Sequence, residues 1–162
     1  MNNTLHNSKD FEGMRKAGNL AASTLDLLVD HVKPGVSTDE LDYFAFEFIT
    51  KNGGLIAPLF YKGFPKSICT SINHVICHGI PSSRILEEGD IVNIDVTVIV
   101  DGWHGDTSRM FPVGKINAKA QKLIDCTFES MHEGIKVAGP KSRLGDIGHA
   151  IQMHAEKNGL SV

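Results

Sequence analysis

The sequence predicts an α+β fold, because segments with helical spacing of apolar residues flank a long segment with the alternation of a β-hairpin. A first helix is expected from Ser8, its predicted N-cap, to Val32. The segment Ile91–Val100 alternates strictly between apolar and mainly polar positions. Two more helices are expected after it, from about Ala118 to Val137 and from about Ser142 to Asn158.

One more helix and several short runs connect the first helix to the alternating segment. Ser37 and Glu40 fit a capping box at the start of a helix that Asn52-Gly53-Gly54 ends. From Leu55 to Gly89 the strand-like runs are short, the clearest is Ile68 to Ile72, and glycines and prolines interrupt them. We expect this region to supply loops that can build a pocket.

The alternating segment predicts the first arm of a hairpin. Its even-numbered residues from Val92 to Val100 are all apolar and share one face, because successive side chains of a strand point to opposite faces. Asp101-Gly102 is a favoured two-residue loop, since glycine accepts the positive φ that a primed turn requires. The second arm should therefore begin at Trp103.

Two aspartates fall on the polar face of this hairpin. In the predicted register Asp95 faces Ser108 and Thr97 faces Asp106, so Asp95 and Asp106 are diagonal neighbours at about 7–8 Å between Cα atoms. Carboxylates this close raise each other's pKa unless a cation lies between them, and divalent metals accept carboxylate oxygens at about 2.0–2.2 Å. We therefore predict a metal site.

Two alternatives stay open for the aspartates. The polar face of the ribbon can simply meet water, as in many antiparallel hairpins. A one-residue bulge at the turn would place Asp95 and Asp106 on opposite faces, because the side-chain direction has a period of two. The metal site is thus conditional on the register.

Composition limits the classes of function. The chain has 162 residues, which suits one domain, with 41% hydrophobic residues and a net charge of −3. No basic run could neutralise a phosphate backbone, so we expect no nucleic-acid partner. A polar start and the lack of about 18 consecutive apolar residues predict a cytoplasmic protein with no membrane partner. The three cysteines form no paired set, which favours reduced thiols.

Several motifs resemble those of one enzyme family, the bacterial type I methionine aminopeptidases. The resemblance extends over nearly the whole chain, in the same order and spacing. The residues that carry it are Pro65-Lys66-Ser67, Ser71-Ile72-Asn73, His78-Gly79-Ile80-Pro81, Gly89 to Asp95 (GDIVNID) and His104 to Ser108 (HGDTS).

The resemblance implies the pita-bread fold and two divalent metal ions, which can be cobalt, manganese, iron or zinc. Family members bind these ions through two aspartates, one histidine and two glutamates, and only the two aspartates, Asp95 and Asp106, can be matched in this sequence. The resemblance also implies that His78 is catalytic, since the matching histidine hydrogen-bonds the substrate near the scissile bond without ligating metal. Taken alone, His78 would more often be a hydrogen-bonded loop residue.

A zinc-binding helix motif can be considered for two of the histidines. His74 and His78 have the spacing of a zinc HExxH helix, but the glutamate is absent and the surroundings disfavour a helix, so we reject that motif.

Tyr61, Phe64 and Cys69 match positions that line the family's methionine-binding pocket, with core packing as the alternative. Phe64 stands where enterobacterial members commonly have tyrosine, so the pocket is expected to differ in detail.

An internal repeat predicts that these residues form part of a longer domain. Pro34, a helix with Leu41, and Lys51-Asn52-Gly53 recur 106 positions later as Pro140, a helix with Ile147, and Lys157-Asn158-Gly159. The family has two αβ halves related by a pseudo-twofold axis, which agrees with the repeat. We interpret residues 1–162 as one incomplete catalytic domain, comprising the first αβ half and the helices of the second.

The implied activity is hydrolytic removal of the initiator methionine from nascent polypeptides. Their N-termini would be the substrate, and ribosome association and a monomeric state are further expectations. Two alternatives remain: a proline-specific aminopeptidase of the same fold, and an inactive fragment or non-catalytic binding module if the polypeptide ends at Val162. Retention of Asp95, Asp106 and His78 argues against a binding module.

Overall fold

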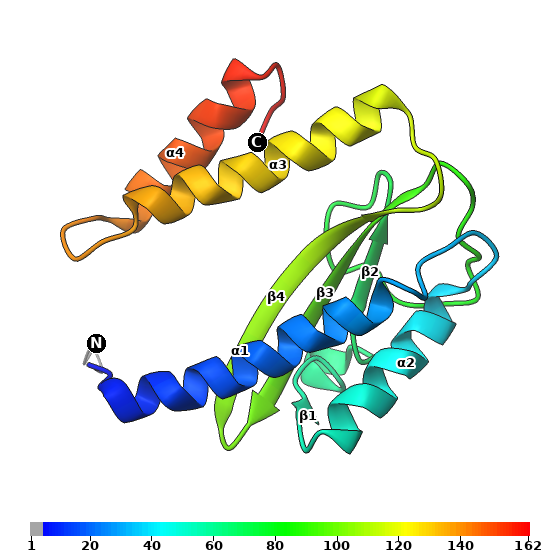
Figure 1. The fold of residues 1–162 in the computed structure, drawn as a ribbon, viewed down its shortest axis with the longest axis horizontal. Helices are drawn as coiled ribbons and strands as arrows, with labels where there is room; N and C mark the ends of the chain where they lie inside the picture. The colour runs from blue at the N-terminus through cyan, green and yellow to red at the C-terminus, as the bar shows by residue number, and fades with distance from the viewer. Residues whose placement is uncertain (1–4) are drawn as a thin grey trace. The chain divides into compact units, whose positions relative to one another are not determined.

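The structure is a computed structural model that describes residues 5–162 (Figure 1). The chain forms two compact units, one ending at Lys115 and the other beginning at Ile116. The expectation of a single catalytic domain over residues 1–162 therefore stays a prediction. The mixture of helices and one antiparallel sheet confirms the α+β class.

The first unit is a sheet covered by two helices. Its central strand is β3, which pairs antiparallel with β4 along its whole length and, on its other edge, with β1 near one end and β2 near the other. The elements are α1 (Ser8–Leu28), α2 (Thr38–Lys51), β1 (Leu55–Ile56), the 3₁₀ turn η1 (Tyr61–Gly63), β2 (Cys69–Ile72), β3 (Ile91–Val100) and β4 (Trp103–Pro112).

The core lies between the sheet and the helices α1 and α2 (Figure 1). As predicted, the even-numbered side chains of β3 are buried, and they pack against the apolar faces of both helices. Helix α1 lies close to β4 because Ala17 is small and Gly105 has no side chain, and a Cβ at Gly105 would overlap the backbone of Ala17. The polar face of β3 is left free on the other side of the sheet.

The first helix has different ends from those predicted. Its N-cap is Asn7 and not Ser8: the Asn7 Oδ1 accepts the amide of Lys9, and the Asp10 carboxylate accepts the Asn7 amide at 2.8 Å. The α-helix ends at Leu28 and not at Val32. Tighter bonds, such as His31 N–H to the Leu28 carbonyl at 3.0 Å, continue the chain in turns that still bury Val32, which explains the longer apolar pattern.

The capping box of the second helix is confirmed. The Ser37 hydroxyl accepts the Glu40 amide at 3.2 Å, and the Glu40 carboxylate accepts the Ser37 amide at 2.8 Å. The pKa of Glu40 is lowered by the Ser37 amide and by the Ser37 hydroxyl, which also donates to the Glu40 carboxylate at 2.7 Å. The strand predicted from Ile68 starts one residue later, at Cys69, because the Ile68 amide is donated to the carboxylate of Asp42.

The second unit is a pair of helices, α3 (Ala118–Val137) and α4 (Leu144–Lys157). The bounds of α3 are those predicted, whereas α4 begins two residues after Ser142, where the Asp146 carboxylate accepts the Arg143 amide at 2.8 Å. Gly134 lets the helices approach, since a Cβ there would meet Ile147 and Ile151.

The repeat is visible in the helices. Helices α2 and α4 each have 14 residues and begin at Thr38 and Leu144, which are 106 positions apart. Their C-caps, Asn52 and Asn158, are each followed by a glycine with φ of +77°. The two helices thus end by the same backbone device.

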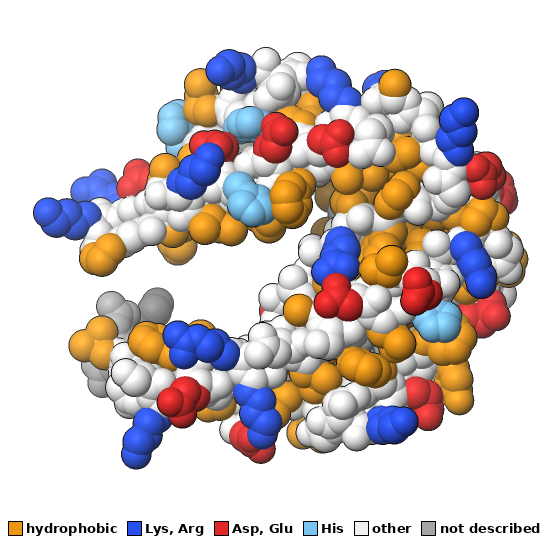
Figure 2. All heavy atoms as spheres, viewed as in Figure 1, with side chains coloured by type: hydrophobic (Ala, Val, Ile, Leu, Met, Phe, Trp, Pro, Cys, Tyr) orange, Lys and Arg blue, Asp and Glu red, His pale blue; other side chains and the backbone are white. Residues whose placement is uncertain are grey.

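Charges of both signs are interspersed over the face drawn in Figure 2. Among the helices that the structure describes, none has the length and apolar character needed to cross a membrane.

The close approach of α1 to β4 predicts opposite effects for two added methyl groups. Gly105→Ala should destabilise the first unit by roughly 1–3 kcal/mol, because the new Cβ meets the rigid backbone of Ala17. Gly18→Ala places a methyl in open space on α1 and should stabilise the unit by about 0.5–1 kcal/mol. The fluorescence of Trp103, the one tryptophan of the sequence, measures both in urea unfolding; equal stability of the two variants would contradict the packing argument.

Candidate metal centre

The hairpin has the predicted register, which brings the two aspartates to one face. Asp95 pairs with Ser108 and Thr97 pairs with Asp106, without a bulge. The loop residues Asp101 and Gly102 both have positive φ, 51° and 83°, as a type I′ turn requires. The possibility that a bulge separates Asp95 from Asp106 is thereby excluded.

The two carboxylates interact directly. The pKa of Asp95 is raised above its usual value, first by burial and then by the charge of the neighbouring Asp106 and a hydrogen bond between the two side chains. The nearby imidazole of His78 acts in the opposite direction. The pair therefore retains negative charge only at a cost, unless a proton or a cation compensates it.

This donor set fits divalent metal ions. Carboxylate oxygens on a half-buried face suit manganese, iron, cobalt and zinc, and a cation between Asp95 and Asp106 would remove the repulsion that raises the pKa of Asp95. Within residues 5–162, no group of three or more His, Cys, Asp or Glu side chains is arranged to hold a metal ion. That Asp95 and Asp106 are metal ligands therefore stays a prediction.

His78 is presented by the loop that follows β2. Its backbone is left-handed, with φ of 54°. The next residue, Gly79, lies against β2, where its carbonyl accepts the Thr70 amide at 2.8 Å and its amide is donated to the Ser71 hydroxyl at 3.1 Å. A Cβ at Gly79 would overlap the backbone of Thr70, so only glycine allows this approach. The glycine of the motif Cys77 to Pro81 (CHGIP) thereby positions His78.

Tyr61 and Phe64 belong to a tight turn before β2. The turn is closed by backbone hydrogen bonds from Phe60 N–H to the Phe64 carbonyl at 2.7 Å and from Tyr61 N–H to the Pro58 carbonyl at 2.9 Å. Lys62, in the middle, has a left-handed backbone. Tyr61 is exposed and Phe64 is partly buried, so both aromatic rings are available to line a cavity.

Cys69 is the first residue of β2 and pairs with Asp95 on β3. The pKa of its thiol is raised to about 11, first by burial and then by the charges of Asp95, Cys77 and Asp106. The thiol is therefore neutral near pH 7 and behaves as a small apolar group. This fits a wall residue and does not fit a nucleophile.

Asp42 on α2 fixes the start of β2. Its carboxylate is 9% exposed and accepts the amides of Ser67 at 2.7 Å and Ile68 at 3.1 Å. Burial raises the pKa of Asp42, and these hydrogen bonds partly offset that rise. On the same helix Asp39 pairs with Lys66 at 2.6 Å. The Pro65-Lys66-Ser67 motif is thus held by two aspartates of α2.

One cavity of about 810 Å³ brings together every site residue predicted from the sequence. These six predicted residues come from six different places in the first unit, namely η1, the residue after it, β2, the loop after β2, β3 and β4. They are Tyr61, Phe64, Cys69, His78, Asp95 and Asp106. Their roles in binding and catalysis remain predictions.

The cavity also holds residues that were not predicted as site residues. Thr97 and His104 lie on the hairpin face whose polarity was predicted, so the alternation was a usable signal. Lys62 was not singled out, and Ile80 was named only as part of the motif His78 to Pro81. No local pattern places them at the cavity, because their position depends on how the turn and the loop fold back over the sheet.

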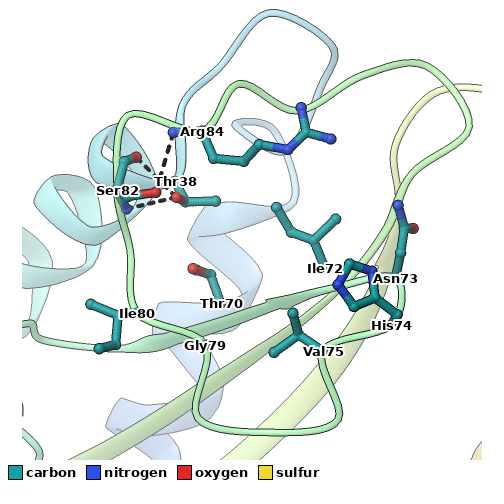
Figure 3. A pocket seen from close by; sticks show the side chains of 10 residues that line it. All are labelled: Thr38, Thr70, Ile72, Asn73, His74, Val75, Gly79, Ile80, Ser82 and Arg84. Atoms are coloured by element: carbon teal, nitrogen blue, oxygen red, sulfur yellow. Dashed lines mark hydrogen bonds between the residues drawn. The ribbon is translucent and has the colours of Figure 1, made fainter.

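A second, smaller cavity of about 240 Å³ opens on the other side of β2 (Figure 3). Thr70 pairs with the buried Ile94 and so points away from the face of Cys69 and Asp95. Its hydroxyl has no hydrogen-bond partner among residues 5–162. Figure 3 shows the Thr38 hydroxyl hydrogen-bonded to the backbone of Ser82 at the rim.

A paired-aspartate centre on an antiparallel hairpin, with an imidazole and an apolar wall, is typical of a metal-dependent hydrolase. A family model described as metallopeptidase family M24 matches residues 12–162. The chain belongs to this metallopeptidase family.

Two curated relatives show which enzymes of this family the chain is similar to. The chain is 59% identical over 158 residues to a methionine aminopeptidase of Rickettsia prowazekii, covering 98% of this chain and 61% of the relative. It is 53% identical over 160 residues to methionine aminopeptidase A of Synechocystis, covering 98% and 63%. The chain thus spans about three fifths of the length of these curated relatives.

The fold comparison agrees. The crystal structure of the Rickettsia prowazekii methionine aminopeptidase matches with a TM-score of 0.94 over 95% of this chain and 62% of that one. A methionine aminopeptidase of Thermotoga maritima, 30% identical, matches with a TM-score of 0.93 over 96% and 63%. An X-Pro aminopeptidase of Thermotoga maritima, 15% identical with a TM-score of 0.81, shares the fold alone. The pita-bread fold is thereby confirmed over the part that the chain spans.

The buried carboxylate of Asp42 predicts a pH-dependent effect on stability. Because its pKa is raised in the folded state, the folded chain holds that proton more tightly than the unfolded chain. Stability should therefore fall as the pH rises from about 3.9, the ordinary aspartate value, through the raised value. The Asp42→Asn variant has no carboxyl to ionise at this position, so its stability should not fall in this way. The free energy of unfolding of the unsubstituted chain, relative to that of the variant, should therefore decrease across this pH range.

Urea unfolding followed by Trp103 fluorescence at a series of pH values measures this difference. Asp30→Asn removes an exposed carboxylate and serves as the matched control. A stability difference between Asp42→Asn and the parent chain that does not change with pH would contradict the assignment.

Proposed function

We propose that this protein is a methionine aminopeptidase, which hydrolyses the N-terminal methionine from other polypeptides. The observation that carries the proposal is the convergence of Asp95, Asp106 and His78 with an apolar, sulfur-containing wall in one cavity. The identity of 59% to a methionine aminopeptidase over nearly the whole chain supports it.

The metal ions would be held by Asp95 and Asp106, together with the ligand types that the family supplies from elsewhere. When bound, divalent ions supply Lewis acidity that favours hydrolysis of a peptide bond. The family membership supports metal dependence, and we propose manganese, iron, cobalt or zinc, since carboxylate-rich sites accept all four and availability decides among them.

His78 would stabilise the scissile peptide by a hydrogen bond. Its ring lies on the cavity wall near Asp95, and an imidazole can donate a hydrogen bond close to neutral pH. The left-handed backbone of His78 and the close approach of Gly79 to Thr70 fix where this ring stands. As the resemblance to the family implies, His78 would act on substrate and not as a metal ligand.

The methionine side chain would lie against Tyr61, Phe64 and Cys69. An unbranched thioether packs well against aromatic edges and a neutral thiol. This pocket would limit the substrates to polypeptides with a free N-terminal methionine. We propose that these are nascent chains in the cytoplasm and that a monomeric enzyme binds them at the ribosome.

A proline-specific aminopeptidase of the same fold is less well supported. The solved structures with proline specificity are 15–20% identical to this chain, so they support the fold alone. The CHGIP and HGDTS contexts of His78 and Asp106 follow the methionine enzymes.

The direct test is methionine release from the tripeptide Met-Ala-Ser with Mn²⁺ or Co²⁺. We expect release by the longer polypeptide, where the gene encodes one, and none by residues 1–162 alone, because two of the five family ligands are matched here. Pro-Ala-Ser and Ala-Pro-Ser serve as controls for proline specificity. Metal binding by the longer polypeptide without methionine release, or its faster cleavage of a proline peptide, would contradict the proposal.

Two variants separate the proposed roles. Asp106→Ala should lower bound metal, measured by elemental analysis after dialysis, because it removes one of the two proposed aspartate ligands. His78→Ala should keep its metal and lose roughly 10²–10⁴-fold in kcat, as expected for a lost hydrogen bond or proton-transfer group at the reacting centre. Unchanged metal content in the first variant, or full turnover in the second, would remove that residue from its role.

A further inference from the structure

The cavity wall carries an unneutralised positive charge. Lys62 lines the cavity that holds Asp95 and Asp106, and among the described residues that line it Lys62 is the only lysine or arginine. Its Nζ lies 5.4 Å from the centroid of the Tyr61 ring. Within residues 5–162, no carboxylate comes within the 4.0 Å of an ion pair with this ammonium.

The backbone under Lys62 is fixed and strained. Phe60 and Lys62 have φ of 66° and 49°, left-handed values that non-glycine residues seldom adopt. Hydrogen bonds on both sides hold the turn, from Phe60 N–H to the Phe64 carbonyl at 2.7 Å and from Phe64 N–H to the Tyr61 carbonyl at 3.0 Å. A glycine would relieve the strain at position 62, so strain maintained beside a cavity points to a use for this side chain.

The place of Lys62 relative to the proposed substrate follows from its neighbours. The methionine side chain would lie against Tyr61, and the scissile carbonyl would lie at Asp95 and Asp106. The rest of the peptide must leave the cavity along its rim, advancing about 3.3–3.6 Å per residue when extended. The residue directly after the bond would stay near the aspartates, and the next one would come within reach of Lys62, which is exposed and lines the cavity.

We propose that Lys62 is a specificity-determining residue that binds an acidic side chain at the third position of the substrate. It attracts a carboxylate there and disfavours a cation, while the Tyr61 ring supports the ammonium from the other side. This inference rests on the proposed aminopeptidase function and adds a preference that the metal centre and the methionine pocket do not supply.

The test compares three peptides that differ only at the third position: Met-Ala-Glu-Ser, Met-Ala-Gln-Ser and Met-Ala-Lys-Ser. All three carry a C-terminal amide, so that no terminal carboxylate competes for Lys62. With the form of the protein that releases methionine, kcat/KM should be about two- to fivefold higher for the glutamate peptide than for the glutamine peptide, as for an exposed ion pair. The lysine peptide should be slower than both, and added salt should reduce these ratios.

Variants assign the preference to one side chain. Lys62→Gln should bring the glutamate-to-glutamine ratio close to one, Lys62→Glu should invert the order of the three peptides, and Lys62→Arg should keep the original order. Lys33→Gln removes the same charge from an exposed position outside the cavity and should leave the ratio as it was.

Three outcomes would overturn the inference. The first is turnover of all three peptides at the same rate. The second is a change in the ratio as large in Lys33→Gln as in Lys62→Gln, which would indicate net charge alone. The third is the absence of methionine release from every peptide, which overturns the proposed function as well, whereas the first two leave that function standing.

Discussion

The pairing of β3 with β4 is the constraint on which the rest of the molecule depends. Ten consecutive pairs, from Ile91 with Pro112 to Val100 with Trp103, set the direction of every side chain on both strands. One face supplies the apolar layer on which α1 and α2 pack, and the other supplies Asp95 and Asp106. Core and candidate centre are therefore two faces of a single ladder, and neither can be rearranged without the other.

The other elements adjust the surroundings of this ladder. Asp42 of α2 holds the chain that leads into Cys69, and Gly79 lets the next loop fold onto the backbone of Thr70. Both devices act at the backbone and leave the side chains of the cavity free. The wall thereby gains an aromatic turn, a neutral thiol and an imidazole from segments that precede the hairpin in the sequence.

Local patterns explain what the sequence could predict. The hairpin register follows from alternation and from the Asp101-Gly102 turn, and α3 begins and ends where its periodicity does. The end of α1 was misplaced because Val32 stays buried after the α-helical hydrogen bonds stop. Lys62 was missed because its position in the cavity wall depends on a left-handed turn, and the residue type at position 62 does not indicate such a turn. Motif resemblance, and not periodicity, selected His78.

Because both faces belong to one ladder, the register that forms the core also sets the geometry of the candidate centre. A slip of one residue between β3 and β4 would separate Asp95 from Asp106, and it would also turn the core side of one strand, either the apolar row of β3 or Phe111 of β4, toward water. A chain in which the two aspartates are separated in this way thus loses part of its core. Such a molecule would expose apolar side chains of the sheet, which chaperones and proteases recognise, before it could bind a substrate. The geometry of the face that carries Asp95 and Asp106 is thus protected by the packing of the opposite face.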